Sequence, residues 1–230
     1  MPERRGTRDI ARVALVGVVV ILVSAGLGAA LAALRSSPEP SGLADVGLRN
    51  PEGFRGNPLP KGIVREPAPD FELADARGGT IGTLDMAGRP YLVTFLYSDC
   101  PDVCALIAEE IRQAFKLLRG RAEEVAALAV SVDPRGDTRE NVLRFLRRHR
   151  LPPNFHYLIG TRDQLAPVWR AYYAAPQLPG RAASAHSASV WVIDARGRIR
   201  TKFSGGAPIP PADIAHDLRQ LLREEAGSRS

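Results

Sequence analysis

The two cysteines of the chain stand close together in the stretch VTFLYSDCPDVCALIAEEI, residues 93–111. Cys100 and Cys104 follow an apolar run and precede a pattern with helical spacing. If both lie on one helical turn, four steps of about 1.5 Å separate their Cα atoms by about 6 Å on one face. A disulfide accepts roughly 4.4–6.8 Å, and two thiolates at this spacing can also bind one soft metal ion. The pair therefore indicates either a redox couple or two ligands of a metal site.

A static structural disulfide is the plain alternative for Cys100 and Cys104. It would close a loop of only a few residues, and such a loop constrains the unfolded chain little. The start of a helix stabilises thiolates and lowers their pKa, which favours both nucleophilic and metal-binding roles. The redox and metal interpretations both stay open on these grounds.

One of the four histidines is a candidate third ligand. His149 ends a predicted helix, His156 lies inside a short predicted strand, and His216 belongs to a predicted terminal helix. His186 differs because it lies in LPGRAASAHSAS, a loop of small residues directly before the predicted strand VWVID. Such a loop can reach the edge of a sheet. Two cysteines and one histidine suit copper by softness, with zinc as a competitor.

The elements that must position these residues alternate along the chain. Buried strands are predicted at 90–97, at 125–133 and in FHYLIG; helices at 103–119, 137–149 and 161–174; a hairpin in SVWVIDARGRIRTKFSG; and a last helix in PPADIAHDLRQLLREE. This order favours an α/β fold with a central mixed sheet flanked by helices. The cysteines fall where a strand ends and a helix begins, and ligands of open α/β sheets bind at that edge.

The N-terminal part of the chain predicts an anchored protein. Residues 13–34 carry no charge, and about 20 such residues span a membrane. Arginines precede the run, so we expect residues 1–12 to be a cytoplasmic tail and the rest to be exported. A cleaved signal peptide is the alternative, but the run is longer than the usual apolar region of such peptides. Residues 35–61 are predicted to be a linker, and residues 62–226 the domain.

Compartment and charge limit the functions further. Thiols on the exported side of a cytoplasmic membrane are oxidised unless a reductant keeps them reduced. The formal net charge is +6, and half of it lies in the N-terminal 35 residues. The remaining excess is too small for a nucleic-acid-binding surface, so no nucleic-acid partner is expected.

Taken together, these pieces resemble the Sco/SenC family, the membrane-anchored, thioredoxin-like copper proteins of cytochrome c oxidase assembly. The resemblance covers about residues 62–224 and rests on four stretches in the family's order: PDFEL, YLVTFLYSDCPDVC, AVSVDPRGDTRENVLRFL and HSASVWVIDARGRI. It implies a thioredoxin-like fold preceded by one transmembrane helix, in which Cys100, Cys104 and His186 bind one copper ion, Cu(I) or Cu(II). In the third stretch, Asp133 and Asp137 would order a loop rather than bind metal.

The resemblance implies a copper metallochaperone, a binding protein rather than an enzyme. It would help to assemble the dinuclear copper centre of the oxidase, with the copper-site subunit, a thiol reductant and a copper donor as partners. Two positions depart from the family: Ala105 stands where a proline is usual, and Ala185 where an aspartate often precedes the histidine. That aspartate could orient the imidazole.

The rival function is an exported thiol–disulfide oxidoreductase. Cys100 and Cys104 would then be the catalytic redox couple that keeps a target's cysteines reduced. The stretch PAPDFEL also suggests a peroxidase, but a peroxidatic cysteine gives no reason for His186. The sequence does not separate copper delivery from thiol reduction.

Overall fold

The structure is a computed structural model, and it describes residues 50, 52–59, 62–63, 66–101, 103–176, 189–204 and 208–228. Both the apolar run at 13–34 and the segment that carries His186 lie outside these residues. Within the described ranges, no helix combines the length and the apolar character needed to span a membrane.

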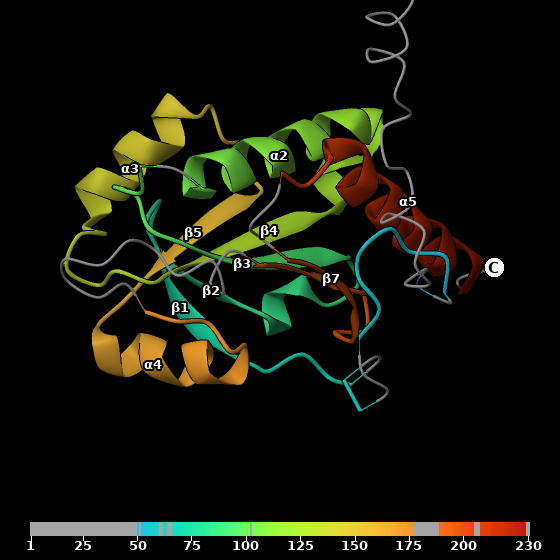
Figure 1. The fold of residues 1–230 in the computed structure, drawn as a ribbon, viewed down its shortest axis with the longest axis horizontal. Helices are drawn as coiled ribbons and strands as arrows, with labels where there is room; N and C mark the ends of the chain where they lie inside the picture. The colour runs from blue at the N-terminus through green and yellow to red at the C-terminus, as the bar shows by residue number, and fades with distance from the viewer. Residues whose placement is uncertain are drawn as a thin grey trace, which may run out of the picture. The chain divides into compact units, whose positions relative to one another are not determined.

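A single mixed sheet forms the centre of the domain (Figure 1). Its strands are β1 (Glu72–Asp75), β2 (Thr80–Gly82), β3 (Tyr91–Leu96), β4 (Ala126–Ser131), β5 (Phe155–Ile159), β6 (Ser189–Ile193) and β7 (Ile199–Ser204). They lie in the order β2-β1-β5-β4-β3-β6-β7. The three central strands β5, β4 and β3 are parallel, whereas the two outer pairs join them antiparallel. The predicted α/β fold with a mixed sheet is therefore confirmed.

Helices cover both faces of the sheet, as Figure 1 shows. They are α2 (Val103–Leu117), α3 (Arg139–Arg148), α4 (Arg162–Ala171) and α5 (Pro211–Ser228), with short 3-10 helices η1 (Leu84–Met86) and η2 (Arg119–Glu124). The figure places α2, α3 and α5 on one face and α4 on the other. Because β3 and β4 are covered on both faces, every residue of these two strands is buried. This explains why both appear in the sequence as continuous apolar runs.

Local sequence signals account for the helix starts. Thr138 caps α3 by accepting a hydrogen bond from the backbone N–H of Asn141 at 3.3 Å. Thr161 and Gln164 form a reciprocal capping box at the start of α4. Pro167 lies inside α4, which continues to Ala171, three residues short of the predicted end.

The hairpin of β1 and β2 was not predicted from the sequence. These strands are only four and three residues long, and only β1 alternates exposed with buried residues. The turn between them contains Gly78 and Gly79, both at positive φ, where glycine is the favoured residue. Strands this short give too weak a periodicity to be recognised against the surrounding loops.

Candidate dithiol metal site

The two cysteines lie at the carboxyl end of β3, the predicted edge of the sheet. The strand ends at Leu96, and the backbone N–H of Cys100 donates to the carbonyl of Tyr97 at 3.3 Å, which closes a turn. Helix α2 begins at Val103, so Cys104 lies in its first turn and Cys100 lies before it. The structure thus differs from a geometry with both cysteines on one helical turn. The two residues are brought together by a turn and a helix start.

The two thiols have unequal surroundings. Cys104 is buried, at 4% exposed, and Cys100 is half-buried. No disulfide joins them in the structure. The backbone N–H of Cys104 donates to Sγ of Cys100 at 3.4 Å. A donor at the N-terminus of a helix stabilises negative charge on the sulfur that it faces. Cys100 is therefore the better placed of the two to be a thiolate at the surface.

The pKa of Cys104 is raised, not lowered as its place at a helix start predicted. The largest cause is its hydrogen bond with Cys100, followed by burial. The negative charges of Cys100 and Asp137 act in the same direction, whereas a backbone hydrogen bond from Tyr97 opposes them. Burial and then a hydrogen bond to Cys100 also raise the pKa of the Tyr97 hydroxyl. Metal-free Cys104 is thus a protonated thiol under ordinary conditions.

A buried carboxylate supports the turn that carries Cys100. Asp137, at 4% exposed, accepts from the backbone N–H of Ser98 at 2.7 Å. It also accepts from the hydroxyls of Ser131 at 2.6 Å and Tyr157 at 3.1 Å. Burial nevertheless raises its pKa. These bonds connect the loop after β4 to the turn after β3, which is the ordering role that the resemblance implied for Asp137.

The neighbouring Asp133 orders the same loop through its backbone carbonyl and its side chain. Its carbonyl accepts from the Asp137 N–H at 2.8 Å, and its side chain accepts from the Arg135 N–H at 3.2 Å.

From the opposite face of the sheet, the indole N–H of Trp169 donates to the carbonyl of Ser131 at 2.8 Å. None of Ser131, Tyr157 and Trp169 was predicted from the sequence to support the site. Ser131 alone gave a signal, since it is a polar residue at the end of a buried strand.

Three of the four histidines lie among the residues that the structure describes. His156 contacts Asp75, with 2.7 Å between Nδ1 and Oδ2, and His216 contacts Asp217 at 3.0 Å. His149 ends α3 against the ring of Phe145. His186 lies outside the described residues. In the part of the chain that the structure describes, no three His, Cys, Asp or Glu side chains are grouped so as to hold a metal ion.

The fold and the thiol pair define a thioredoxin-like protein with a two-cysteine site at the end of the first parallel strand. The chain belongs to the SCO1/SenC family, whose model matches residues 64–223. The predicted family is thereby confirmed.

Individual relatives agree with this assignment. The mitochondrial SCO2 homologue of Bos taurus is 31% identical over 163 residues, which is 69% of this chain and 56% of the bovine protein. SenC of Rhodobacter capsulatus is 33% identical over 54% of this chain and 57% of its own length. The match thus spans little more than half of each of these relatives.

A solved structure extends the likeness to three dimensions. ScoI of Bradyrhizobium japonicum, solved with copper bound, is 28% identical with a TM-score of 0.57. The match covers 68% of this chain and 99% of that one. A SCO1/SenC family lipoprotein of Bacillus anthracis, at 22% identity and a TM-score of 0.61, shows the same fold over 71% of this chain and 99% of its own.

Proposed function

We propose that this protein is a copper metallochaperone that binds one copper ion through Cys100, Cys104 and His186. It would help to assemble the dinuclear copper centre of cytochrome c oxidase, with the copper-site subunit as its partner. The carrying observation is the placement of Cys104 and Cys100 at the sheet edge, with the N–H of one 3.4 Å from the sulfur of the other. The two thiols are also joined by a side-chain hydrogen bond, and such a pair can chelate a soft ion.

The topology supports His186 as the third ligand. Val190 pairs antiparallel with Thr94, so β6 begins beside the end of β3 that leads to Cys100. His186 precedes Ser189, the first residue of β6, by three residues. Three residues of extended chain span about 11 Å at most. A short stretch of chain therefore connects this imidazole to the edge that carries the two sulfurs.

The relatives support copper as the cargo. The 28% identical ScoI was solved with copper bound, and a Stutzerimonas stutzeri relative carries the description putative copper-binding protein. A neighbour of similar fold, BsSco, is described as a member of the Sco family of cytochrome c oxidase assembly proteins. We extend copper binding and oxidase assembly from these proteins to this chain.

We further propose that the chain is anchored by residues 13–34, with the domain on the exported side of the cytoplasmic membrane. The uncharged run and the arginines before it support this topology. Exported thiols meet oxidising conditions, so a reductant and a copper donor protein are expected partners.

The second candidate function is that of an exported thiol–disulfide oxidoreductase. The observation that favours it is the unequal exposure of the two sulfurs. The half-buried Cys100 can attack a target disulfide, and the buried Cys104 can then resolve the mixed disulfide. The same two sulfurs would serve both functions, but not at once. A disulfide cannot bind copper as two thiolates do, so only the reduced pair could carry the ion.

Copper titration of the reduced, detergent-solubilised full chain tests the proposal. We expect one copper ion per chain, and no such site in Cys100→Ser or Cys104→Ser. Ser98→Ala is a matched control outside the ligand set. If the wild-type chain bound no copper but reduced a disulfide substrate through Cys100, the oxidoreductase would be the correct function.

A further inference from the structure

Residues 52–59, which composition places in the linker, contact the folded domain. We call them the strap. Phe54 is buried, at 4% exposed. Asn57 forms an antiparallel bridge with Lys202 on β7, the last strand of the sheet, and its backbone N–H donates to the Lys202 carbonyl at 2.9 Å. The hydroxyl of Thr201 donates to the Asn57 carbonyl at 2.9 Å. The strap therefore covers the edge of the sheet at β7.

A buried carboxylate on α5 holds the middle of the strap. Asp217 is fully buried and accepts from the backbone N–H groups of Arg55 at 2.7 Å and Gly56 at 2.9 Å. Nearby, the side chain of Gln220 donates to the Glu52 carbonyl at 2.7 Å. Hydrogen bonds to a carboxylate are stronger than those between neutral groups. Removal of the strap would leave Asp217 without these two donors, at a cost in stability.

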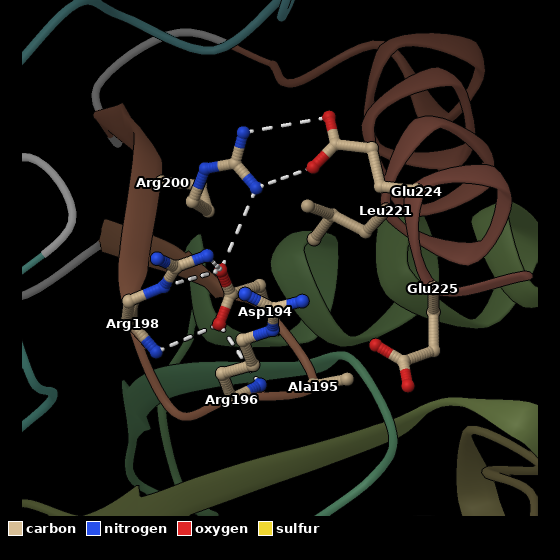
Figure 2. A pocket seen from close by; sticks show the side chains of 8 residues that line it. All are labelled: Asp194, Ala195, Arg196, Arg198, Arg200, Leu221, Glu224 and Glu225. Carbon is tan, nitrogen blue, oxygen red and sulfur yellow. Dashed lines mark hydrogen bonds and ion pairs between the residues drawn. The ribbon is translucent and has the colours of Figure 1, made fainter. Parts of the chain in front are cut away.

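A buried arginine joins the strap to the hairpin and to α5. The side chain of Arg200 is 4% exposed and lies 2.8 Å from Glu52 of the strap. Figure 2 shows the same guanidinium between Glu224 of α5, at 2.6 Å, and Asp194 at the end of β6, at 3.5 Å. It also lies 4.9 Å from the centre of the Phe54 ring. A buried cation needs such partners, so Arg200 depends in part on the strap.

Gly56 shows how closely the strap fits. A Cβ atom at this position would lie 2.5 Å from Oγ1 and 2.9 Å from Cγ2 of Thr201. Only glycine allows the backbone to approach β7 this far. Gly62, six residues further on, has no atom within 4 Å of such a Cβ and provides a matched control.

We propose that the strap docks the chain leading from the membrane onto the β7–α5 side of the domain, so that at most residues 35–49, instead of 35–61, separate the anchor from the docked chain. This inference rests on the proposed membrane anchor. Fifteen residues reach about 50 Å when fully extended, and release of the twelve residues 50–61 adds about 40 Å. The docked strap thus limits how far Cys100 can travel from the membrane. It thereby selects partners whose receiving site lies close to that surface.

Hydrogen exchange on the full chain in detergent tests the docking. In the wild-type chain, the peptide covering the strap should exchange at least tenfold more slowly than an unstructured peptide. Gly56→Ala should abolish this protection, Gly62→Ala should preserve it, and the double variant Gly56→Ala with Thr201→Ala should restore part of it. Protection in α5 should persist in all variants. Unprotected exchange of the wild-type strap would overturn the proposal, whatever the variants do.

Energy transfer in proteoliposomes tests the tether. A dye on Cys100 and an acceptor dye on lipid headgroups report the distance of the site from the membrane. Gly56→Ala should lower the transfer efficiency, and Gly62→Ala should leave it unchanged. Equal efficiencies in both variants would overturn the role of the strap in the tether. Loss of the wild-type chain from floated vesicles would instead refute the anchor on which the inference rests.

Discussion

The backbone N–H of Cys104 points at the sulfur of Cys100, 3.4 Å away. The contact makes a chemically unequal pair, because one sulfur receives a donor from a helix start while the other is buried behind it. An unequal pair suits two tasks. The outer sulfur can meet an incoming ion or disulfide first, and the inner one completes the chelate or the intramolecular disulfide.

We predict that Cys100 is alkylated faster than Cys104 in the reduced, metal-free chain. Exposure and the donated N–H favour attack by Cys100, whereas burial and a raised pKa slow Cys104. Peptide mapping by mass spectrometry after a short iodoacetamide pulse should show a difference of about tenfold or more. In denaturant the two should react alike, and faster native labelling of Cys104 would contradict the asymmetry.

We predict that the reduced chain loses stability above about pH 9. The folded state raises the pKa of Cys104 above its ordinary value of 9.0, so above that pH the unfolded chain releases a proton that the folded chain retains. The free energy of unfolding then falls by up to about 1.4 kcal/mol per pH unit. Urea unfolding between pH 8 and 10 should show a steeper fall for the wild type than for Cys104→Ala. Burial raises the pKa of Tyr97 and Tyr157 in both chains, and the charge of Cys104 adds to this rise only in the wild type, so both effects steepen the wild-type curve.

Much of this framework was predictable from local patterns. The buried strands β3 and β4 are continuous apolar runs, and α2 has helical spacing with the cysteines at its start. The proximity of Cys100 and Cys104 follows from their spacing in the chain. The position of Cys100 outside the helix does not, because the turn closed on Tyr97 is a backbone contact that residue types do not encode.

Long-range polar contacts were the part that the sequence could not supply. Arg200 and Glu52 pair at a separation of 148 residues, and no local pattern marks an arginine that will be buried. Composition therefore assigned the strap to the linker, although Phe54 packs in the domain. The pKa of Cys104 was misjudged for a related reason. The helix start is visible in the sequence, but the burial and the neighbouring charges that outweigh it are not.

We predict that Asp137→Asn destabilises the fold by about 1–3 kcal/mol. The amide has one acceptor oxygen instead of two and turns an N–H₂ group toward donors, whereas the carboxylate accepts from Ser98, Ser131 and Tyr157. Urea unfolding measures the loss. Asp133→Asn is the control, since its side chain is less buried and accepts from a single backbone N–H, that of Arg135. Equal losses in the two variants would show that the hydrogen bonds of Asp137 contribute no more to the free energy of unfolding than the single bond of Asp133.

We predict that a chain beginning at residue 62 is less stable than one beginning at Leu48 by about 3 kcal/mol. Burial of a phenylalanine such as Phe54 contributes about 1.5–3 kcal/mol, and Arg200 and Asp217 lose partners as well. Denaturant unfolding of the two reduced chains measures the difference. Equal midpoints would mean that the strap adds nothing to the domain and that the folded unit starts near residue 62.

We predict that loss of the His186 imidazole weakens the binding of Cu(II) more than that of Cu(I). Two thiolates alone can hold Cu(I), whereas Cu(II) prefers a mixed set of nitrogen and sulfur ligands. His186→Ala should therefore weaken Cu(II) binding by more than about tenfold, a change of the size seen when support of a metal ligand is lost. Cu(I) binding should change much less, and Cys100→Ser or Cys104→Ser should weaken both.

The neighbour of His186 adds a second test of the same ligand. Ala185 supplies no carboxylate to orient the imidazole, so Ala185→Asp should strengthen Cu(II) binding if His186 is a ligand. The same substitution should have no effect in a His186→Ala background. The measurement is thiolate-to-copper charge-transfer absorption during anaerobic titration of each reduced variant. An unchanged spectrum and affinity in His186→Ala would reduce the site to a bare dithiol, and the oxidoreductase function would then be favoured over copper delivery.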